Sequence, residues 1–180
     1  MKCAIEFQYC YRAGVSALTL VYWLLLTNSP AFSADSIKVS SMKYDDASWH
    51  PEGTDGEYTL PEGSSRTHIG LFLAWAITRD LVSDYHTKEH ADALAEVKAR
   101  TMTGSEYLHR YCGDKLLADD LNEAGNAFAE MFYEQSYLGG EYLFAADPGM
   151  DADSLYQIPD TWATFDVVAA MLDSYFASRM

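Results

Sequence analysis

Residues 42–180 lack the features by which several protein classes are recognised. They contain one cysteine, Cys112, because Cys3 and Cys10 lie upstream, so no internal disulfide framework can support the fold. They also lack a glycine-rich phosphate loop, a G-x-S-x-G elbow and a C-x-x-C pair, which are common marks of nucleotide-binding, hydrolytic and redox sites. Aromatic and aliphatic neighbours predict that Cys112 is a half-buried structural thiol.

Positive charge is scarce. The chain has 12 basic and 27 acidic residues, a net charge of −15. Three basic and two acidic residues lie upstream of residue 42, which leaves 9 basic (12 − 3) and 25 acidic (27 − 2) residues, a net charge of −16. Such a domain repels phosphates and anionic lipids, so nucleic acid and membrane surfaces are poor partners. A basic protein is a better partner, and solubility alone is the alternative explanation of the charge.

A long uncharged apolar run occurs near the start of the chain. Residues 13–26 read AGVSALTLVYWLLL, which is short for a membrane span but typical of a signal-peptide core. We expect residues 1–33 to be a signal peptide cleaved after Ser33, which would make the domain periplasmic or secreted. The alternative is a misassigned upstream extension, with translation from Met42 and a cytoplasmic domain.

Helical periodicity dominates residues 42–180. With 49% hydrophobic and 14% aromatic residues, the chain is too apolar to be disordered. Apolar residues recur at spacings of three and four, and convincing strand alternation is missing. We therefore expect a single acidic all-α domain over 42–180, with about five helices and one short β-hairpin or irregular aromatic segment.

Caps and breakers predict the boundaries of these elements. Prolines and glycines make residues 44–66 an irregular arm. A cap at Ser64, Ser65 or Thr67 begins a helix that runs to about Val82 and is apolar almost all round, which predicts a central position. Further helices are expected over Lys88–Arg100, from a Thr103–Glu106 capping box to about Gly113, from Asp119 or Asp120 through LNEAGNAFAEMFYEQ, and from Asp160 or Thr161. Gly125 predicts a close approach of another helix or an aromatic ring, and SYLGGEYLFAADPG fits a strand, a helical turn or an aromatic loop.

Residues 86–90 read H-x-x-E-H, a spacing that places two imidazoles and a glutamate around zinc in some peptidases. Thr87 is the expected helix cap, which would put His86 before the helix, and an acidic third ligand of the expected pattern does not follow. The string is therefore interpreted as two solvated histidines at a helix start.

A second polar group lies in the arm. Asp45, Asp46 and His50 place two carboxylates and an imidazole within six residues, a set that could hold a divalent metal or act as acid and base. In an extended arm the two carboxylates point to opposite faces, so we expect one of them to cap a turn and Trp49 to anchor the arm on the helices. His68 is expected to be a hydrogen-bonded structural residue. We therefore assign no catalytic, cofactor-binding or metal-binding residue and expect no cofactor.

Four strings taken together resemble a family of uncharacterised bacterial domains: MKYDDASWH, THIGLFLAW, DDLNEAGNAFAEMFYE and DTWATFD. The resemblance covers residues 42–180 and implies a start at Met42. It brings no established enzymatic activity, and small acidic domains of this kind are often suspected of being immunity proteins that neutralise bacterial toxins. The candidate functional positions that it implies are Tyr44, Asp45, Asp46, Trp49, His50, Thr67, His68, Trp75, Asn122 and Asn126, with Gly70, Gly125 and Trp162 as further distinctive positions.

Three functions remain in view. The leading interpretation is an acidic protein-binding domain of the immunity type, an inhibitor whose expected partner is a basic, toxin-like protein. The alternative is a metal- or small-molecule-dependent enzyme that uses Asp45, Asp46, His50 and His68, or else a structural or regulatory bacterial domain.

Overall fold

A computed structural model describes residues 42–179, apart from residues 53, 56–57 and 150–154. The described residues belong to one compact unit, Ser40–Met180. The expected leader and its cleavage site lie outside the described residues. Among the described helices, none is both long and apolar enough to cross a membrane. The fold is mainly helical, as expected, with two small antiparallel sheets.

Helix α3 (Ser64–Thr78) is the centre of this unit. Its residues are buried from Ile69 to Ile77, so the prediction of a central, all-round apolar helix is confirmed. Its predicted boundaries were wrong. Gly63, with a φ of 79°, occupies the N-cap without a side-chain cap bond, and the helix ends four residues before Val82. It ends there because Asp80 adopts a φ of 57° and Leu81 N–H returns to the Ala76 carbonyl, which completes a Schellman motif.

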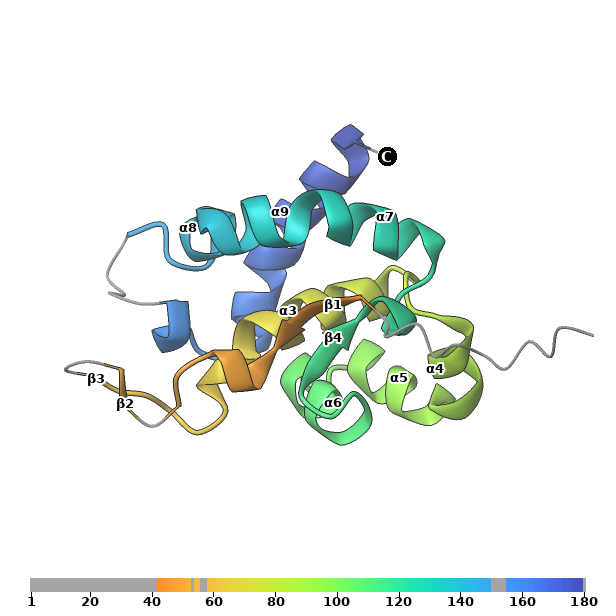
Figure 1. Cartoon of the computed structure of the whole chain (residues 1–180), viewed down its shortest axis with the longest axis horizontal. Coiled ribbons are helices and arrows are strands. Elements are labelled where there is room, and N and C mark those ends of the chain that lie inside the picture. The colour runs from red at the N-terminus through yellow and green to blue at the C-terminus, as the bar shows by residue number, and fades with distance from the viewer. Residues whose placement is uncertain (1–41, 53, 56–57, 150–154, 180) are drawn as a thin grey trace, which may run out of the picture. The chain divides into compact units, whose positions relative to one another are not determined.

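Three short helices lie on one side of α3 (Figure 1): α4 (Asp84–Glu89), α5 (Ala91–Lys98) and α6 (Gly104–Tyr111). Helices α4 and α5 replace the single helix predicted over Lys88–Arg100, because the backbone breaks at His90. The Thr103–Glu106 capping box of α6 is confirmed. Helix α6 packs tightly on α3, since a Cβ atom placed on Gly104 would lie 1.8 Å from the Gly70 carbonyl oxygen.

The arm is more regular than predicted. Strand β1 (Lys43–Asp46) pairs antiparallel with β4 (Lys115–Leu117), with Lys43 opposite Leu117 and Asp46 opposite Lys115. A one-turn 3-10 helix, η2 (Ala47–Trp49), follows β1, and β2 (Thr54–Asp55) pairs with β3 (Tyr58–Thr59). The prediction of an arm without strands over residues 44–66 was therefore wrong. Residues 44–46 pair with a strand about 70 residues along the chain, and Thr54–Asp55 pairs with Tyr58–Thr59 within the arm.

The second half of the domain covers α3 with a run of consecutive helical segments. After η3 (Ala118–Asp120), α7 (Glu123–Phe132) leads into the π-helix η4 (Tyr133–Glu141) and α8 (Tyr142–Ala146). Asn122 caps α7, in place of the predicted Asp119 or Asp120. The close approach predicted at Gly125 is present, but its partner is the Leu81 carbonyl, 2.5 Å from a Cβ atom placed there.

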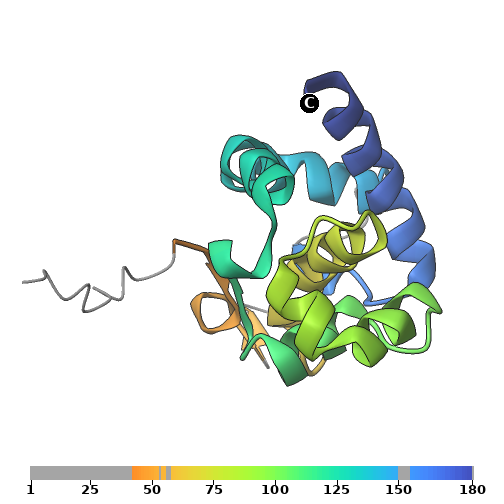
Figure 2. The same cartoon turned by 90° about the vertical axis from the view of Figure 1, so that its right-hand side faces the viewer.

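A last helix completes the core. After η5 (Leu155–Gln157), α9 (Trp162–Arg179) begins with the predicted cap, because Thr161 Oγ1 accepts from Thr164 N–H. Seen from the side, the yellow α3 lies between the teal α7 and the blue α9 (Figure 2). Aromatic rings fill the space between these three helices, with Trp75 packed between Phe128 and Phe176.

Candidate functional site

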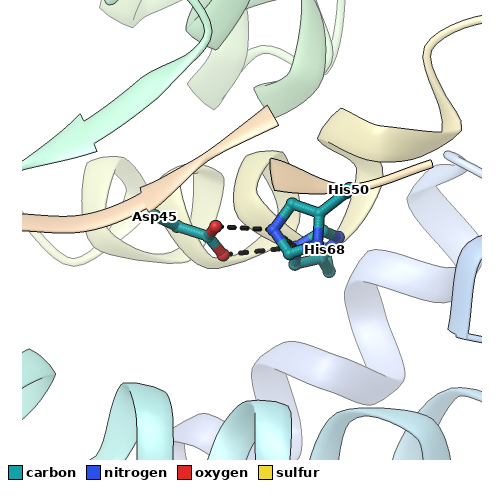
Figure 3. A group of neighbouring side chains, drawn as sticks. All are labelled: Asp45, His50 and His68. Carbon is teal, nitrogen blue, oxygen red and sulfur yellow. Dashed lines mark hydrogen bonds and ion pairs between the residues drawn. The ribbon is translucent and has the colours of Figure 1, made fainter. Parts of the chain in front are cut away.

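Three residues from two separate segments meet where the arm crosses α3. Asp45 comes from β1 and points inward, whereas its neighbour Asp46 accepts from Ser48 N–H and caps η2. The η2 turn then brings His50 back over Asp45, and His68 rises from the second turn of α3. Figure 3 shows the two imidazoles on one side of the Asp45 carboxylate.

The donor atoms of these three side chains lie very close together. His50 Nε2 is 2.6 Å from Asp45 Oδ1, and His68 Nε2 is 3.2 Å from Asp45 Oδ2. The two Nε2 atoms are 3.2 Å apart, and the rings meet edge to face. The three side chains expose 2% (Asp45), 0% (His68) and 13% (His50) of their surface, so only His50 reaches solvent appreciably.

Burial and hydrogen bonding act against each other at this cluster. Burial alone would raise the pKa of the Asp45 carboxyl, but hydrogen bonds from His50 and His68 outweigh it and hold the pKa well below its usual range. Burial lowers the pKa of His68, and Asp45 only partly opposes this. At neutral pH the cluster is therefore an ionised carboxylate facing a neutral His68.

Tyrosines form a second layer around the cluster, and sequence reasoning did not assign them to it. Tyr133 donates to Asp45 Oδ2 at 2.8 Å, and Tyr156 lies 2.9 Å from His50 Nδ1. Tyr137 donates to the His68 backbone carbonyl at 2.8 Å. The only signal for Tyr133 and Tyr137 was their place at the end of an apolar stripe, where a buried hydroxyl needs a polar partner. Within the described residues, His68 Nδ1 has no partner.

Residues 43–156 match a family described as "Domain of unknown function (DUF7832)". The chain belongs to this family. No curated protein and no solved structure matches the chain. The DUF7832 match contains Asp45, His50 and His68 together with the tyrosines that contact them, and it ends before α9.

The remaining candidate positions within the DUF7832 domain have structural contacts. Tyr44 donates to Asn126, and the Asn126 amide bonds the carbonyls that precede α7. Asn122 caps α7 and also donates to the Asp80 carbonyl. Trp75 is buried and donates to Asp173, and Thr67 is buried in α3.

Asp46 and Trp49 are not part of the cluster that Asp45, His50 and His68 form. Asp46 accepts from Lys43 at 2.7 Å, which lowers its pKa to about 2, and faces away from Asp45. The four-residue enzyme site of the alternative interpretation is thus reduced to three. Trp49, expected to anchor the arm on the helices, is 60% exposed, with the Lys43 ammonium 4.6 Å from its ring centroid. That prediction was wrong because η2 turns the indole outward.

The H-x-x-E-H string does not form the predicted pair of solvated histidines. His86 lies inside α4 and is fully buried, so both the predicted Thr87 cap and the solvated histidine were wrong at this position. His90 ends α4 and packs on Tyr111, with ring centroids 4.8 Å apart. Cys112 is half-buried, as expected.

Proposed function

We propose that the DUF7832 domain binds a divalent transition-metal ion, with Zn²⁺ as the best-suited species, through His50 Nε2, His68 Nε2 and the Asp45 carboxylate. One observation carries this proposal: the two Nε2 atoms lie 3.2 Å apart and face the same carboxylate. A tetrahedral zinc ion with bonds of about 2.0–2.1 Å holds its ligand atoms about 3.3 Å apart. The cluster needs only small side-chain movements to reach that geometry.

The surrounding contacts support the same assignment. Metal-binding imidazoles and carboxylates are usually held in place by hydrogen bonds from an outer layer of residues. Tyr133 holds Asp45 Oδ2 in this way, and Tyr156 contacts the ring nitrogen of His50 that faces away from Asp45. Two imidazoles and one carboxylate favour zinc and related ions over Mg²⁺ and Ca²⁺, which prefer oxygen ligands throughout.

Burial favours an ion that joins segments over one that acts on a substrate. Exposures of 2% and 0% for Asp45 and His68 leave little room for a substrate beside the ligands. The ion would connect the arm, which supplies Asp45 and His50, to the central helix, which supplies His68. Its role is to hold residues 43–50 on α3.

The test is a count of zinc ions bound per purified chain. Metal-free protein is titrated with Zn²⁺ by calorimetry, as wild type and as His50→Ala, which changes the most exposed ligand. We expect the variant to bind one equivalent fewer. His109→Ala is the matched control, because His109 is an exposed histidine on α6 beside Asp114. Equal zinc content in wild type and His50→Ala would refute the proposal.

A second candidate function is an acidic protein-binding domain of the immunity type. The ion pairs that the basic side chains form support it. Residues 42–180 contain nine Lys and Arg residues, and within the described part of this range seven of them form ion pairs with carboxylates. This pairing neutralises the cations locally and leaves the excess carboxylates to set the surface potential. Three exposed glutamates follow one face of α7 and η4: Glu123, Glu130 and Glu134. A basic, toxin-like protein is the partner that this surface would attract.

The test of this second function is salt-dependent capture of a basic protein. Tagged protein is exposed to a lysate of the native organism at low salt, and captured proteins are released with salt and identified. A variant with Gln at positions 123, 130 and 134 should lose the captured protein. The matched control neutralises three exposed acids on the other side of the domain, Glu89, Asp92 and Glu96. Equal capture by both variants would exclude the α7 face as the binding surface.

A further inference from the structure

A second cluster of metal-binding residue types lies away from the Asp45 cluster and shares no residue with it. Its members are His86 on α4, Cys112 directly after α6, and Asp120 at the end of η3. One donor atom from each side chain lies within 4.8 Å of the other two. His86 and Asp120 are buried, with relative exposures of 0% and 8%, and Cys112 is half-buried.

In His86 and in Asp120, the polar atom that points away from the cluster already has a hydrogen-bond partner. Tyr107 OH lies 2.8 Å from His86 Nδ1, and Leu117 N–H donates to Asp120 Oδ2 at 2.7 Å. The inward atoms, His86 Nε2 and Asp120 Oδ1, face each other at 3.0 Å. This is the outer-layer arrangement typical of metal ligands, in which one atom is fixed by the protein and the other is presented to the ion.

The Cys112 sulfur adds a third kind of donor at the same place. The His86–Asp120 hydrogen bond does not by itself require a thiol beside it. Among the residues that the structure describes, the Cys112 thiol has no hydrogen-bond partner. The donor set of one sulfur, one imidazole nitrogen and one carboxylate oxygen suits a borderline-soft ion such as Zn²⁺ or Co²⁺.

We infer that His86, Cys112 and Asp120 form a second metal site, which takes a zinc-class ion through Sγ, Nε2 and Oδ1. With bonds of about 2.3 Å to sulfur and about 2.0–2.1 Å to nitrogen and oxygen, the donor atoms would lie about 3.3–3.6 Å apart. The sulfur can reach that separation by rotation about the Cys112 side-chain bond at the end of α6. The ion displaces the thiol proton, which leaves to the buffer, and the His86 imidazole changes tautomer, so that its proton moves from Nε2 to Nδ1 and is donated to the Tyr107 hydroxyl oxygen. A water molecule completes four-coordination.

This site differs from the zinc-peptidase pattern that residues 86–90 resemble. That pattern pairs His86 with Glu89 and His90, but here His86 turns towards Asp120 and Cys112, which lie 34 and 26 residues further along the chain. His90 instead packs against Tyr111, with the two rings tilted at 44° to each other. The ion would tie together the ends of three short elements, α4, α6 and η3.

Cobalt absorption tests this inference separately from the proposed function. A thiolate bound to Co²⁺ produces a charge-transfer band in the near ultraviolet, and the Asp45–His50–His68 cluster contains no sulfur. The protein used is the whole chain with Cys3→Ser and Cys10→Ser, so that Cys112 is its only thiol. We expect the band to grow to one Co²⁺ per chain and to disappear in Cys112→Ser.

Three further variants complete the design. His50→Ala and His90→Ala should keep the thiolate band, the first because it belongs to the other cluster and the second because His90 is not a ligand. Cys112→Ala, which adds no polar atom, repeats the loss of the band, with far-ultraviolet circular dichroism as the folding check. Absence of the band in the single-thiol protein, or its survival in either Cys112 variant, would overturn the inference. Failure of the proposed function would appear instead as unchanged zinc content in His50→Ala.

Discussion

Replacing Tyr133 with phenylalanine tests whether Asp45 is an ionised carboxylate in the folded protein. The change removes one hydroxyl from a side chain that is 1% exposed and keeps its ring packing on Phe72. The lost hydrogen bond is 2.8 Å long and ends on a buried carboxylate oxygen. A hydrogen bond to a charged group contributes about 1.5–3 kcal/mol to stability. We therefore expect the free energy of unfolding to fall by about 2 kcal/mol.

Tyr137→Phe is the matched control. Tyr137 is also fully buried, its ring lies 5.3 Å from that of Tyr133, and its hydroxyl donates to a backbone carbonyl over the same 2.8 Å. Because this acceptor is neutral, the expected loss is only about 0.5–1.5 kcal/mol. Urea unfolding in the presence of a chelator measures both, and with a slope of about 2 kcal/mol per molar urea the midpoints should fall by about 1 M and about 0.5 M.

The comparison between the two variants shows whether the Asp45 carboxylate is ionised in the folded protein. A Tyr137→Phe loss as large as that of Tyr133→Phe would mean that the acceptor of Tyr133 carries no charge, and the description of Asp45 as an ionised ligand would be wrong. Repeating the measurement with zinc adds a second readout. Loss of an outer-layer hydrogen bond typically weakens metal binding by about 10–100-fold, and only Tyr133→Phe should show that loss.

Three further predictions concern the scaffold. Burial raises the pKa of Asp160, so the folded state favours the protonated carboxyl. The stability that this protonated carboxyl contributes is present below the unfolded pKa of about 3.9 and is lost as pH rises through the folded pKa. Asp160→Asn should therefore gain stability relative to wild type between pH 4 and pH 7 in urea unfolding, and a constant difference would contradict this. Asn122→Ala removes the α7 cap and should lower the free energy of unfolding by about 0.5–2 kcal/mol, with Asn122→Ser as the capping control. Gly70→Ala places a Cβ atom 2.3 Å from the Ser105 backbone nitrogen and should lower the thermal midpoint far more than Gly139→Ala, where a Cβ atom meets nothing within 4 Å.

Local signals predicted the elements whose ends depend on neighbouring residues. The capping box of α6 and the Thr161 cap of α9 follow from side chains three residues from their backbone partners. The end of α3 was not predictable in this way, because it depends on a non-glycine residue, Asp80, in the left-handed region. The β1–β4 pairing was missed because its partners lie about 70 residues apart and neither strand is long enough to show alternation.

The candidate site was half visible in the sequence. The arm placed Asp45 and His50 within reach of each other, and alternation correctly separated Asp46 from its neighbour. Their meeting with His68 depends on how the arm crosses α3, which no local pattern encodes. His86 was misjudged for a related reason: its partners, Tyr107 and Asp120, come from elements that follow it by 21 and 34 residues.

The pairing of β1 with β4 determines how the domain would respond to mechanical force. Tension applied through residue 42 and directed across the strands would act first on the Lys43–Leu117 pair at the end of a two-stranded ladder, and the bonds of that ladder would then break one after another. Asp45 would be pulled out within the first few residues of extension, while α3 and its aromatic neighbours stayed packed. An ion held by Asp45, His50 and His68 would turn this easy peeling into a single rupture at higher force, so the arm would act as a metal-dependent mechanical latch.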